Sequence, residues 1–209
     1  MSLLVKICGI TNLEDAKWAV ESGADALGFM FYEKSKRHIS PRDAGAIIRE
    51  LPSATRFVGV FVDAKKPEVE NAIELSGITT LQFHGQETPG YCQEFMLPVW
   101  KALLVHSRAS LENMNSYSTE AILLDAFVPG ERGGTGARFD WNLAVEARLH
   151  HLPIILAGGL TPENVSEAVK LINPFGVDVS SGVESAPGRK DRQKVKTFIS
   201  RARVSLKIS

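Results

Sequence analysis

Eight short apolar runs, rich in β-branched residues, alternate along the chain with segments of helical periodicity. This alternation is typical of a parallel sheet whose strands are joined by helical crossovers. The predicted strands, each followed by a predicted helix, cover residues 3–8, 26–31, 56–62, 80–84, 99–105, 121–125, 153–157 and 176–180. Eight such units close naturally into a barrel, and 209 residues with 44% apolar side chains suffice for its core. We therefore predict an α/β fold in which residues 1–209 form a single (β/α)8 TIM-barrel domain.

An open, doubly wound sheet is the alternative arrangement of these units. Its dinucleotide-binding form carries G-x-G-x-x-G after the first strand, and residues 8–11 read Cys-Gly-Ile-Thr instead. The division into units is supported by residues with N-cap preferences that precede several of the predicted helices. These residues are Thr11, Ser40, Asp140 and Thr161, and proline directly follows Ser40 and Thr161.

The balance of charges argues against a polyanionic partner. Lys and Arg number 24, as do Asp and Glu, so we expect a small-molecule ligand and neither nucleic acid nor an anionic membrane surface. The two cysteines, Cys8 and Cys92, make no disulfide framework, and neither a secretory leader nor a membrane-length apolar stretch is found. This predicts a reduced, cytoplasmic protein. The five histidines have no metal-ligand spacing, so we expect no metal.

Two ionisable side chains end two of the predicted strands. Cys8 closes the first apolar run before a glycine turn, and Asp125 closes the sixth run in the same way. Barrels of this kind place functional groups at the carboxyl ends of their strands, so the two side chains can face one pocket as base and acid. Each also has a structural alternative, because free cysteines are often small buried hydrophobes and aspartates are common in turns.

Small residues follow the seventh and eighth predicted strands. Gly158 and Gly159 come after the seventh, and Ser180, Ser181 and Gly182 come at the end of the eighth. Loops at these two places frequently bind phosphate in such barrels, because their backbone N–H groups can approach an anion closely. The pattern predicts a phosphorylated ligand. The alternative is a pair of tight turns that merely need glycine.

Strand alternation predicts a buried ion pair beneath the same pocket. Lys6 shares one face of the first strand with Cys8, and Asp178 shares a face of the neighbouring eighth strand with Ser180. An ionised side chain buried there without a partner would be very costly, so we expect Lys6 and Asp178 to pair. A positive charge below Cys8 would also favour its thiolate. A purely structural ion pair is the alternative.

Two further features lie at strand ends. Residues 133–136 read Gly-Gly-Thr-Gly without the Lys-Ser or Lys-Thr of a P-loop, and we expect them to form a flexible cover over the site. The alternative is a mobile connection without function. His84 closes the fourth predicted strand, where a role in the site and a structural role are both open.

Nine short motifs spread over nearly the whole chain occur in the order found in a known enzyme family. They lie at residues 6–11, 35–37, 59–61, 82–85, 124–125, 133–136, 139–141, 156–160 and 178–184. On these motifs the chain resembles the phosphoribosylanthranilate isomerases, barrel enzymes of tryptophan biosynthesis that perform an Amadori rearrangement. The departures are mild, since the family often has Ser-Pro-Arg where this chain has Ser35, Lys36 and Arg37, and often leucine at Phe83.

The resemblance implies a role for each matching residue. Asp125 would be the general acid that opens the sugar ring, Cys8 the general base that removes the proton from C2′, and Arg37 the partner of the anthranilate carboxylate. The remaining substrate-binding residues that it implies, those of the phosphate loops included, are His84, Gly158, Gly159, Asp178, Ser180, Ser181 and Gly182. The substrate would be a small phosphorylated molecule, no cofactor would be needed, and the protein would be a monomer or a homodimer.

Two alternative functions stay open. Another phosphosugar barrel, such as the imidazole-pathway isomerase or the tryptophan synthase α subunit, would share the phosphate site, but that isomerase uses two aspartates where this chain has Cys8. A catalytically silent barrel that binds a phosphorylated ligand belongs to a different class. Only the joint presence of Cys8, Asp125 and Arg37 argues against it, because fold alone does not determine function.

Overall fold

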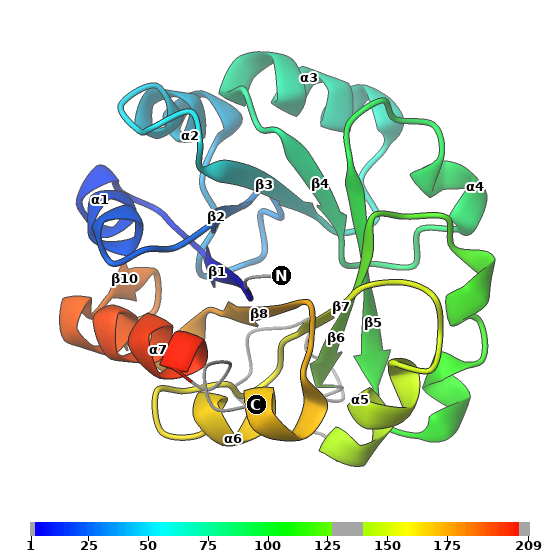
Figure 1. Cartoon of the computed structure of the whole chain (residues 1–209). Helices are drawn as coiled ribbons and strands as arrows, with labels where there is room; N and C mark the ends of the chain where they lie inside the picture. Colours follow the sequence, from blue (N-terminus) through cyan, green and yellow to red (C-terminus); the bar gives the residue numbers. More distant parts are fainter. Residues whose placement is uncertain (1–2, 127–139, 205–209) are drawn as a thin grey trace.

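Eight parallel strands form a closed barrel in the computed structural model, which describes residues 3–126 and 140–204 (Figure 1). The strands are β1 (Leu4–Cys8), β2 (Ala26–Met30), β3 (Arg56–Phe61), β4 (Thr80–Phe83), β5 (Val99–Val105), β6 (Ala121–Ala126), β7 (Ile154–Leu156) and β8 (Gly176–Val179). Each strand pairs with its neighbours in sequence, and β1 pairs with β8 to close the barrel. The predicted (β/α)8 barrel is confirmed, and the open doubly wound sheet is excluded.

Several strands end one residue earlier than predicted. Ser180 illustrates the reason, because its φ of −122° and ψ of −83° leave the extended region and start a short 3-10 helix, η3 (Ser181–Val183). The β1 strand ends at Cys8 as predicted, and β6 continues one residue beyond Asp125. The residues expected to carry chemistry therefore lie at the carboxyl ends of the strands or directly after them.

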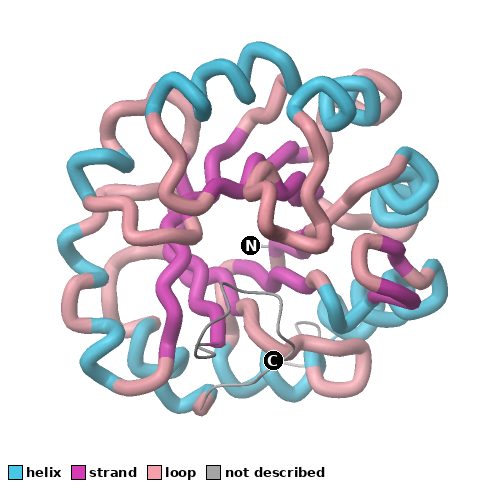
Figure 2. Tube along the Cα trace, turned by 180° about the vertical axis from the view of Figure 1, so that it is seen from behind, coloured by secondary structure: helices cyan, strands magenta, loops and turns pink. Residues whose placement is uncertain are grey.

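Helices form an outer ring around the strands (Figure 2). They are α1 (Leu13–Glu21), α2 (Pro41–Ile48), α3 (Lys66–Ser76), α4 (Pro89–Cys92), α5 (Trp141–Ala147), α6 (Val165–Ile172) and α7 (Arg192–Val204). The prediction of a helix after every strand is wrong for β5, which is followed by two short 3-10 helices, η1 (Arg108–Leu111) and η2 (Met114–Ser116). Serines and asparagines are frequent in this segment and favour local turns over a continuous α-helix.

Two of the predicted N-caps are confirmed. The hydroxyl of Ser40 accepts a hydrogen bond from the Asp43 backbone N–H at 3.1 Å and starts α2. The carboxylate of Asp140 accepts one from the Asn142 N–H at 3.0 Å and starts α5. Each side chain thereby satisfies a backbone donor that the first turn of the helix leaves unpaired.

The predicted cap at Thr11 is wrong, and the one at Thr161 caps the turn before α6, where its hydroxyl accepts a hydrogen bond from the Glu163 backbone N–H at 3.2 Å. The cap of α1 is Asn12, whose side-chain oxygen accepts from the Asp15 N–H at 2.9 Å, so this helix begins one residue later than Thr11 implies. The helix α6 begins after Asn164, three residues beyond Thr161. Asn164 also accepts a hydrogen bond from the Thr161 backbone N–H at 2.9 Å, which holds this stretch as a turn before the helix starts.

The interior of the barrel is apolar toward the amino ends of the strands, which we call its lower part, and polar toward their carboxyl ends, its upper part. Its apolar cluster consists of Ala26, Val58, Trp100, Ala102, Ala121, Leu123, Ile155 and Ala157, with Leu4 packed against it. Alternation along the strands places Lys6, Gln82 and Asp178 on the same inward faces, nearer to the carboxyl ends. A second, larger apolar cluster lies between the strands and the outer helices. The packed interior closes the barrel from below and leaves chemistry to its upper rim.

A small antiparallel hairpin follows η3 and was not predicted. Its strands, β9 (Glu184–Ala186) and β10 (Arg189–Lys190), lie outside the barrel and beside α7 (Figures 1 and 2). Gly188 has a positive φ of 78°, a conformation that glycine adopts without strain, and this allows the chain to reverse in so few residues. The hairpin brings Glu184 and Lys190 back toward the mouth of the barrel.

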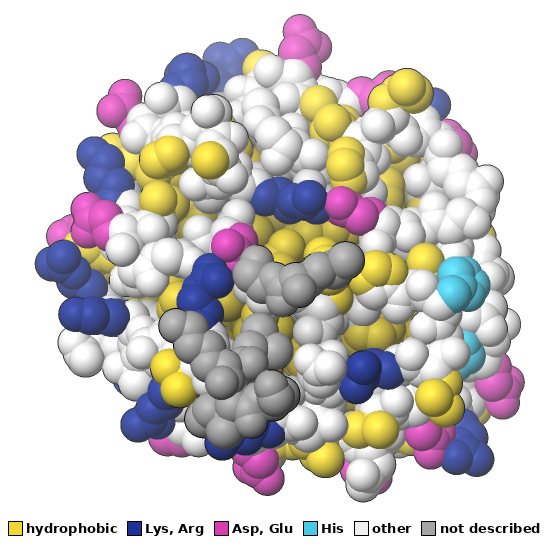
Figure 3. Space-filling model, viewed as in Figure 1, with side chains coloured by type: hydrophobic (Ala, Val, Ile, Leu, Met, Phe, Trp, Pro, Cys, Tyr) yellow, Lys and Arg dark blue, Asp and Glu magenta, His cyan; other side chains and the backbone are white. Residues whose placement is uncertain are grey.

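The surface carries charges of both signs. In the face shown in Figure 3, Lys and Arg side chains alternate with Asp and Glu around the rim. Both signs occur on the described part of that face, and Lys and Arg are the more frequent along its left edge. Among the described residues, no helix is both long enough and apolar enough to span a membrane.

Candidate active site

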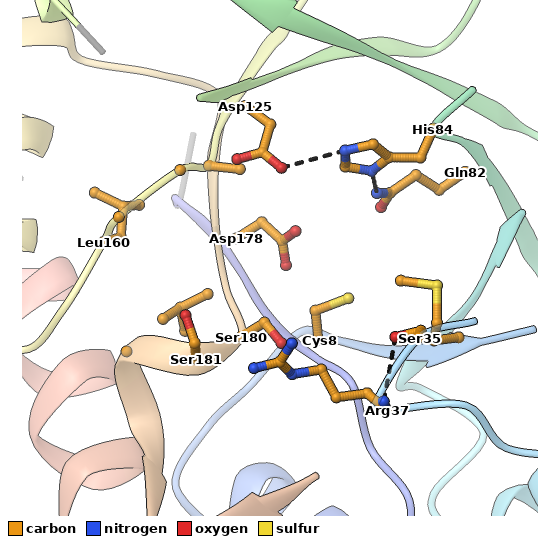
Figure 4. Close-up of a pocket in the computed structure, with 16 residues that line it drawn as sticks. Cys8, Ser35, Arg37, Gln82, His84, Asp125, Leu160, Asp178, Ser180 and Ser181 are labelled. Carbon is orange, nitrogen blue, oxygen red and sulfur yellow. Dashed lines mark hydrogen bonds and ion pairs between the residues drawn. The ribbon is translucent and has the colours of Figure 1, made fainter. Parts of the chain in front are cut away.

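A pocket at the carboxyl ends of the strands contains every predicted site residue (Figure 4). Those residues are Cys8, Arg37, His84, Asp125, Gly158, Gly159, Asp178, Ser180, Ser181 and Gly182. The structure adds Met30, which lies in none of the family motifs, and five residues within those motifs to which sequence reasoning assigned no role, namely Ser35, Gln82, Ala157, Leu160 and Val179. The glycine-rich cover expected at residues 133–136 lies outside the described residues.

Cys8 occupies its place because the neighbouring strand has no side chain there. Gly28 is the register partner of Cys8 on β2, and a Cβ atom added to Gly28 would lie 2.6 Å from the sulfur. Only glycine leaves room for the thiol at this contact. The thiol is almost fully buried, with 6% of Cys8 exposed, and it still lines the pocket. Sequence reasoning missed Gly28, since nothing local distinguishes it from other strand glycines.

The predicted ion pair lies directly below the thiol. Lys6 and Asp178 are register partners across β1 and β8, and Nζ of Lys6 lies 2.9 Å from Oδ1 of Asp178. Burial by itself lowers the pKa of Lys6, but the charges of Asp178 and Cys8 outweigh burial and raise that pKa. Lys6 is therefore a buried ammonium group whose charge is balanced by the carboxylate.

The effect of Lys6 on the thiol has the expected sign but does not prevail. Burial is the largest influence on Cys8 and raises its pKa, while the charge of Lys6 lowers it and the charge of Asp178 raises it. The net result is a raised pKa, which corrects the expectation of a favoured thiolate. The physical reason is that the same packing that places Cys8 above Lys6 also removes the sulfur from water. Lys6 limits the cost of forming the thiolate without abolishing it.

Asp125 is held at one carboxylate oxygen and faces His84 with the other. Its Oδ1 accepts a hydrogen bond from the Ala126 backbone N–H at 2.8 Å, and its Oδ2 lies 3.2 Å from Nε2 of His84. The other ring nitrogen of His84, Nδ1, lies 3.0 Å from Nε2 of Gln82. Figure 4 shows Asp125 and His84 pointing toward one another, with Asp178 and Cys8 projecting into the same pocket.

Two glycines, one in the loop after β7 and one in the loop after β8, lie too close to neighbouring backbone to carry a side chain. Gly158 has a φ of +76°, and a Cβ atom there would lie 2.5 Å from the Ala126 backbone nitrogen. A Cβ atom on Gly182 would lie 1.9 Å from the carbonyl oxygen of Leu160. Packing alone explains both glycines, as the structural alternative predicts: Gly158 lies against β6 and Gly182 against the loop after β7. Both glycines line the pocket. Their place at the pocket fits an anion site.

Arg37 is clamped by a carboxylate that sequence reasoning assigned no role. Its Nε and Nη2 donate to the two oxygens of Glu184 at 3.0 Å and 2.8 Å, an arrangement with two parallel hydrogen bonds. Glu184 also accepts from Nζ of Lys190 at 3.0 Å. Burial by itself raises the pKa of Glu184, but hydrogen bonds and charge from Arg37 and Lys190 lower it overall. Two cations around one carboxylate leave a net positive charge beside the pocket.

Sequence reasoning could not find this cluster from local signals. Arg37 and Glu184 are 147 positions apart, and the hairpin that carries Glu184 and Lys190 has no clear strand pattern. The only available signal was the place of Glu184 at the end of the last matching motif. The described residues contain no group of His, Cys, Asp and Glu side chains that could hold a metal ion.

Comparisons with known proteins agree with this geometry. A family model described as N-(5′-phosphoribosyl)anthranilate (PRA) isomerase matches residues 5–201. An N-(5′-phosphoribosyl)anthranilate isomerase of Geobacter sp. (strain M21) is 52% identical over 199 residues, which cover 95% of this chain and 97% of the relative.

Solved structures show the same barrel. The crystal structure of phosphoribosyl anthranilate isomerase from Thermotoga maritima has a TM-score of 0.89 and 44% identity, covering 96% of this chain and 98% of that one. A second structure of such an isomerase, in complex with reduced 1-(o-carboxyphenylamino)-1-deoxyribulose 5-phosphate, has a TM-score of 0.86 and 43% identity with the same coverage. The barrel, the matched residues and these relatives together show that the chain belongs to the N-(5′-phosphoribosyl)anthranilate isomerase family.

Proposed function

We propose that the pocket catalyses the Amadori rearrangement of N-(5′-phosphoribosyl)anthranilate to 1-(2-carboxyphenylamino)-1-deoxyribulose 5-phosphate, a step of tryptophan biosynthesis. Family membership supports the reaction, and one observation supports the assignment of roles. Cys8 and Asp125, from β1 and β6, line one pocket between Arg37 on one side and the loops after β7 and β8 on the other. A base and an acid are thus available to a substrate held at both ends.

In the first step Asp125 donates a proton to the substrate. Its carboxyl group protonates the ring oxygen of the phosphoribosyl group, the bond from C1′ to this oxygen breaks, and the anthranilate nitrogen supplies the electron pair that forms a protonated Schiff base. Asp125 is left as a carboxylate. Its burial, with 6% of the residue exposed, keeps water from competing for the transferred proton.

In the second step Cys8 accepts a proton from the substrate. Its thiolate removes the proton from C2′, and the electrons of that bond move to the Schiff base and form an enolamine, which tautomerises to the ketone. The charge of Lys6, below the sulfur, lowers the pKa of Cys8 and so stabilises the thiolate. Only protons move between the protein and the substrate, so this mechanism requires no external redox partner.

The two ends of the substrate have separate anchors in this proposal. Arg37 keeps its guanidinium at the pocket while Glu184 holds it in place, and it binds the anthranilate carboxylate. The loops that contain Gly158, Gly159, Ser180, Ser181 and Gly182 bind the phosphate. Binding at both ends orients the sugar between the acid and the base, so binding energy serves the reacting atoms.

The direct test adds purified protein to freshly generated N-(5′-phosphoribosyl)anthranilate and follows the loss of anthranilate fluorescence. We expect a fast loss with the wild-type protein, and most of the turnover to be lost in Cys8→Ala or Asp125→Asn, both of which should retain the fold by circular dichroism. A folded wild-type protein without activity would favour another phosphosugar isomerase or a ligand-binding barrel. Wild-type kcat in either variant would remove that residue from the mechanism.

A further inference from the structure

The side chains of Gln82, His84 and Asp125 form a connected chain along one wall of the pocket. We propose that Gln82 and His84 are positioning residues for Asp125. Gln82 sets the tautomer of His84, and His84 orients the carboxyl group and stabilises the charge it acquires on giving up its proton. This inference rests on the proposed function, and it replaces a direct substrate contact as the main role of His84.

The end of β4 places Gln82 and His84 side by side. They are two residues apart, so strand alternation points both side chains to the same face, and Nε2 of Gln82 lies 3.0 Å from Nδ1 of His84. An amide nitrogen can only donate, so Nδ1 of the imidazole must accept. A neutral imidazole that accepts at Nδ1 carries its hydrogen on Nε2.

The protonated nitrogen then faces Asp125. Nε2 of His84 lies 3.2 Å from Oδ2 of Asp125, with angles outside hydrogen-bond geometry, and it has no hydrogen-bond partner among residues 3–126 and 140–204. The Ala126 N–H holds Oδ1, so a small rotation of the carboxyl group completes the second contact. Catalytic contacts are often loose before the substrate binds and shorten in the reacting complex.

The contact between His84 and Asp125 matters when Asp125 gives up its proton. When Asp125 protonates the sugar oxygen it becomes a carboxylate, and a buried carboxylate without donors is costly. Hydrogen bonds to an ionised acceptor are about twice as strong as neutral ones, so the Nε2–H group stabilises Asp125 more after the transfer than before it. His84 keeps its own proton throughout, and the proton that reaches the substrate comes from Asp125. The effect belongs to the transition state, and it should therefore appear in kcat rather than in KM.

The tautomer can be tested without any substrate. In protein labelled with ¹⁵N in its histidine rings, the proton–nitrogen correlation spectrum distinguishes hydrogen on Nε2 from hydrogen on Nδ1, and His84→Gln assigns the signals. We expect the Nε2–H form in the wild-type protein. Gln82→Glu, which replaces the amide donor by an acceptor of similar shape, should move a hydrogen to Nδ1. An Nδ1–H tautomer in the wild-type protein would mean the opposite amide orientation and would overturn the proposal.

Kinetics test the role itself. We expect His84→Leu to lower kcat about a hundredfold, the usual effect of removing one donor to a charge that develops in the transition state, with KM changed less than about threefold. His84→Gln, whose amide N–H can take the place of Nε2–H, should recover most of the loss. His151→Leu, at an exposed histidine, is the matched control and should retain wild-type kcat.

A double variant separates positioning from direct binding. If His84 acts through Asp125, His84→Leu should cause little further loss once Asp125 is already Asn, because the charge that it stabilises no longer forms. A raised KM for His84→Leu, or losses that multiply in the double variant, would show a direct substrate contact and refute the proposal. The two hypotheses can fail separately, since an inactive wild-type protein would disprove the proposed reaction while the NMR result would still report the tautomer.

Discussion

Replacing Lys6 by Met should reveal two effects of the Lys6 charge, one on the free energy of unfolding and one on the pKa of Cys8. The substitution keeps an unbranched chain of similar length and removes the ammonium group, which leaves Asp178 buried and without its partner at 2.9 Å. Breaking a buried pair in this way costs about 3–5 kcal/mol of unfolding free energy. The pKa of Cys8 should rise further, since the charge of Lys6 is the largest influence that lowers it. Each unit of that rise reduces the thiolate fraction at neutral pH about tenfold, and kcat should fall with it.

A second variant, Lys6→Met with Asp178→Asn, is the matched control. Removal of both charges should restore much of the unfolding free energy, because no unpaired ion remains. The pKa of Cys8 should fall below that of Lys6→Met, because the charge of Asp178 raises it, and it should stay above the wild-type value, because Lys6 has the larger influence. Stability and thiol chemistry should thus respond differently to the same pair of substitutions.

Two measurements follow both effects. Urea unfolding gives the free energies. Thiolate absorbance in the ultraviolet, recorded against pH in a Cys92→Ser background, reports Cys8 alone, because the chain has two cysteines. A Cys8 pKa that does not change in Lys6→Met would refute the electrostatic coupling. A Lys6→Met protein as stable as the wild type would refute the buried charge pair.

Three further predictions follow from the same structure. Glu184→Gln should raise KM about tenfold or more with a smaller change in kcat, because it weakens the paired hydrogen bonds that hold Arg37. Steady-state kinetics measure both constants, and an unchanged KM would contradict this prediction. Gly28→Ala should lower kcat and cost about 1–3 kcal/mol, because the added methyl group would lie 2.6 Å from the sulfur of Cys8; a stable, fully active variant would show that the strand adjusts at no cost. Cys92 has a pKa raised from 9.0 to about 11, so its contribution to stability is complete below pH 9 and is lost as the pH rises through 11. Cys92→Ala should flatten the fall in unfolding free energy over that range, and an unchanged slope would assign the fall to other groups.

Much of the fold could be predicted because its signals are local. Each strand is an apolar run of a few residues, and eight repeats of one unit leave a closed barrel as the natural solution. The segment after β5, the cap at Thr11 and the start of α6 were predicted wrongly because several polar residues compete there to start a helix or a turn. The β9–β10 hairpin was missed because two very short strands leave no periodicity to detect.

The same distinction holds for the site. The types and order of its residues, Cys8 and Asp125 above all, can be recognised at strand ends, and barrel geometry brings strand ends to one face. The clamp on Arg37 could not be recognised, because Glu184 reaches it from the other end of the chain. Gly28 could not be recognised either, since its role depends on which atom of β1 lies opposite.

The sequence by itself determined the eightfold alternation of strand and helix and the chemical groups that end the strands. Only the tertiary structure decided what state those groups adopt. The thiol of Cys8 is the clearest case, because the sequence places a lysine two positions before it and thereby suggests a favoured thiolate. Burial by many side chains outweighs that one charge and raises the pKa. Desolvation and Coulomb energies are sums over all neighbours in space, and most of those neighbours are distant in sequence.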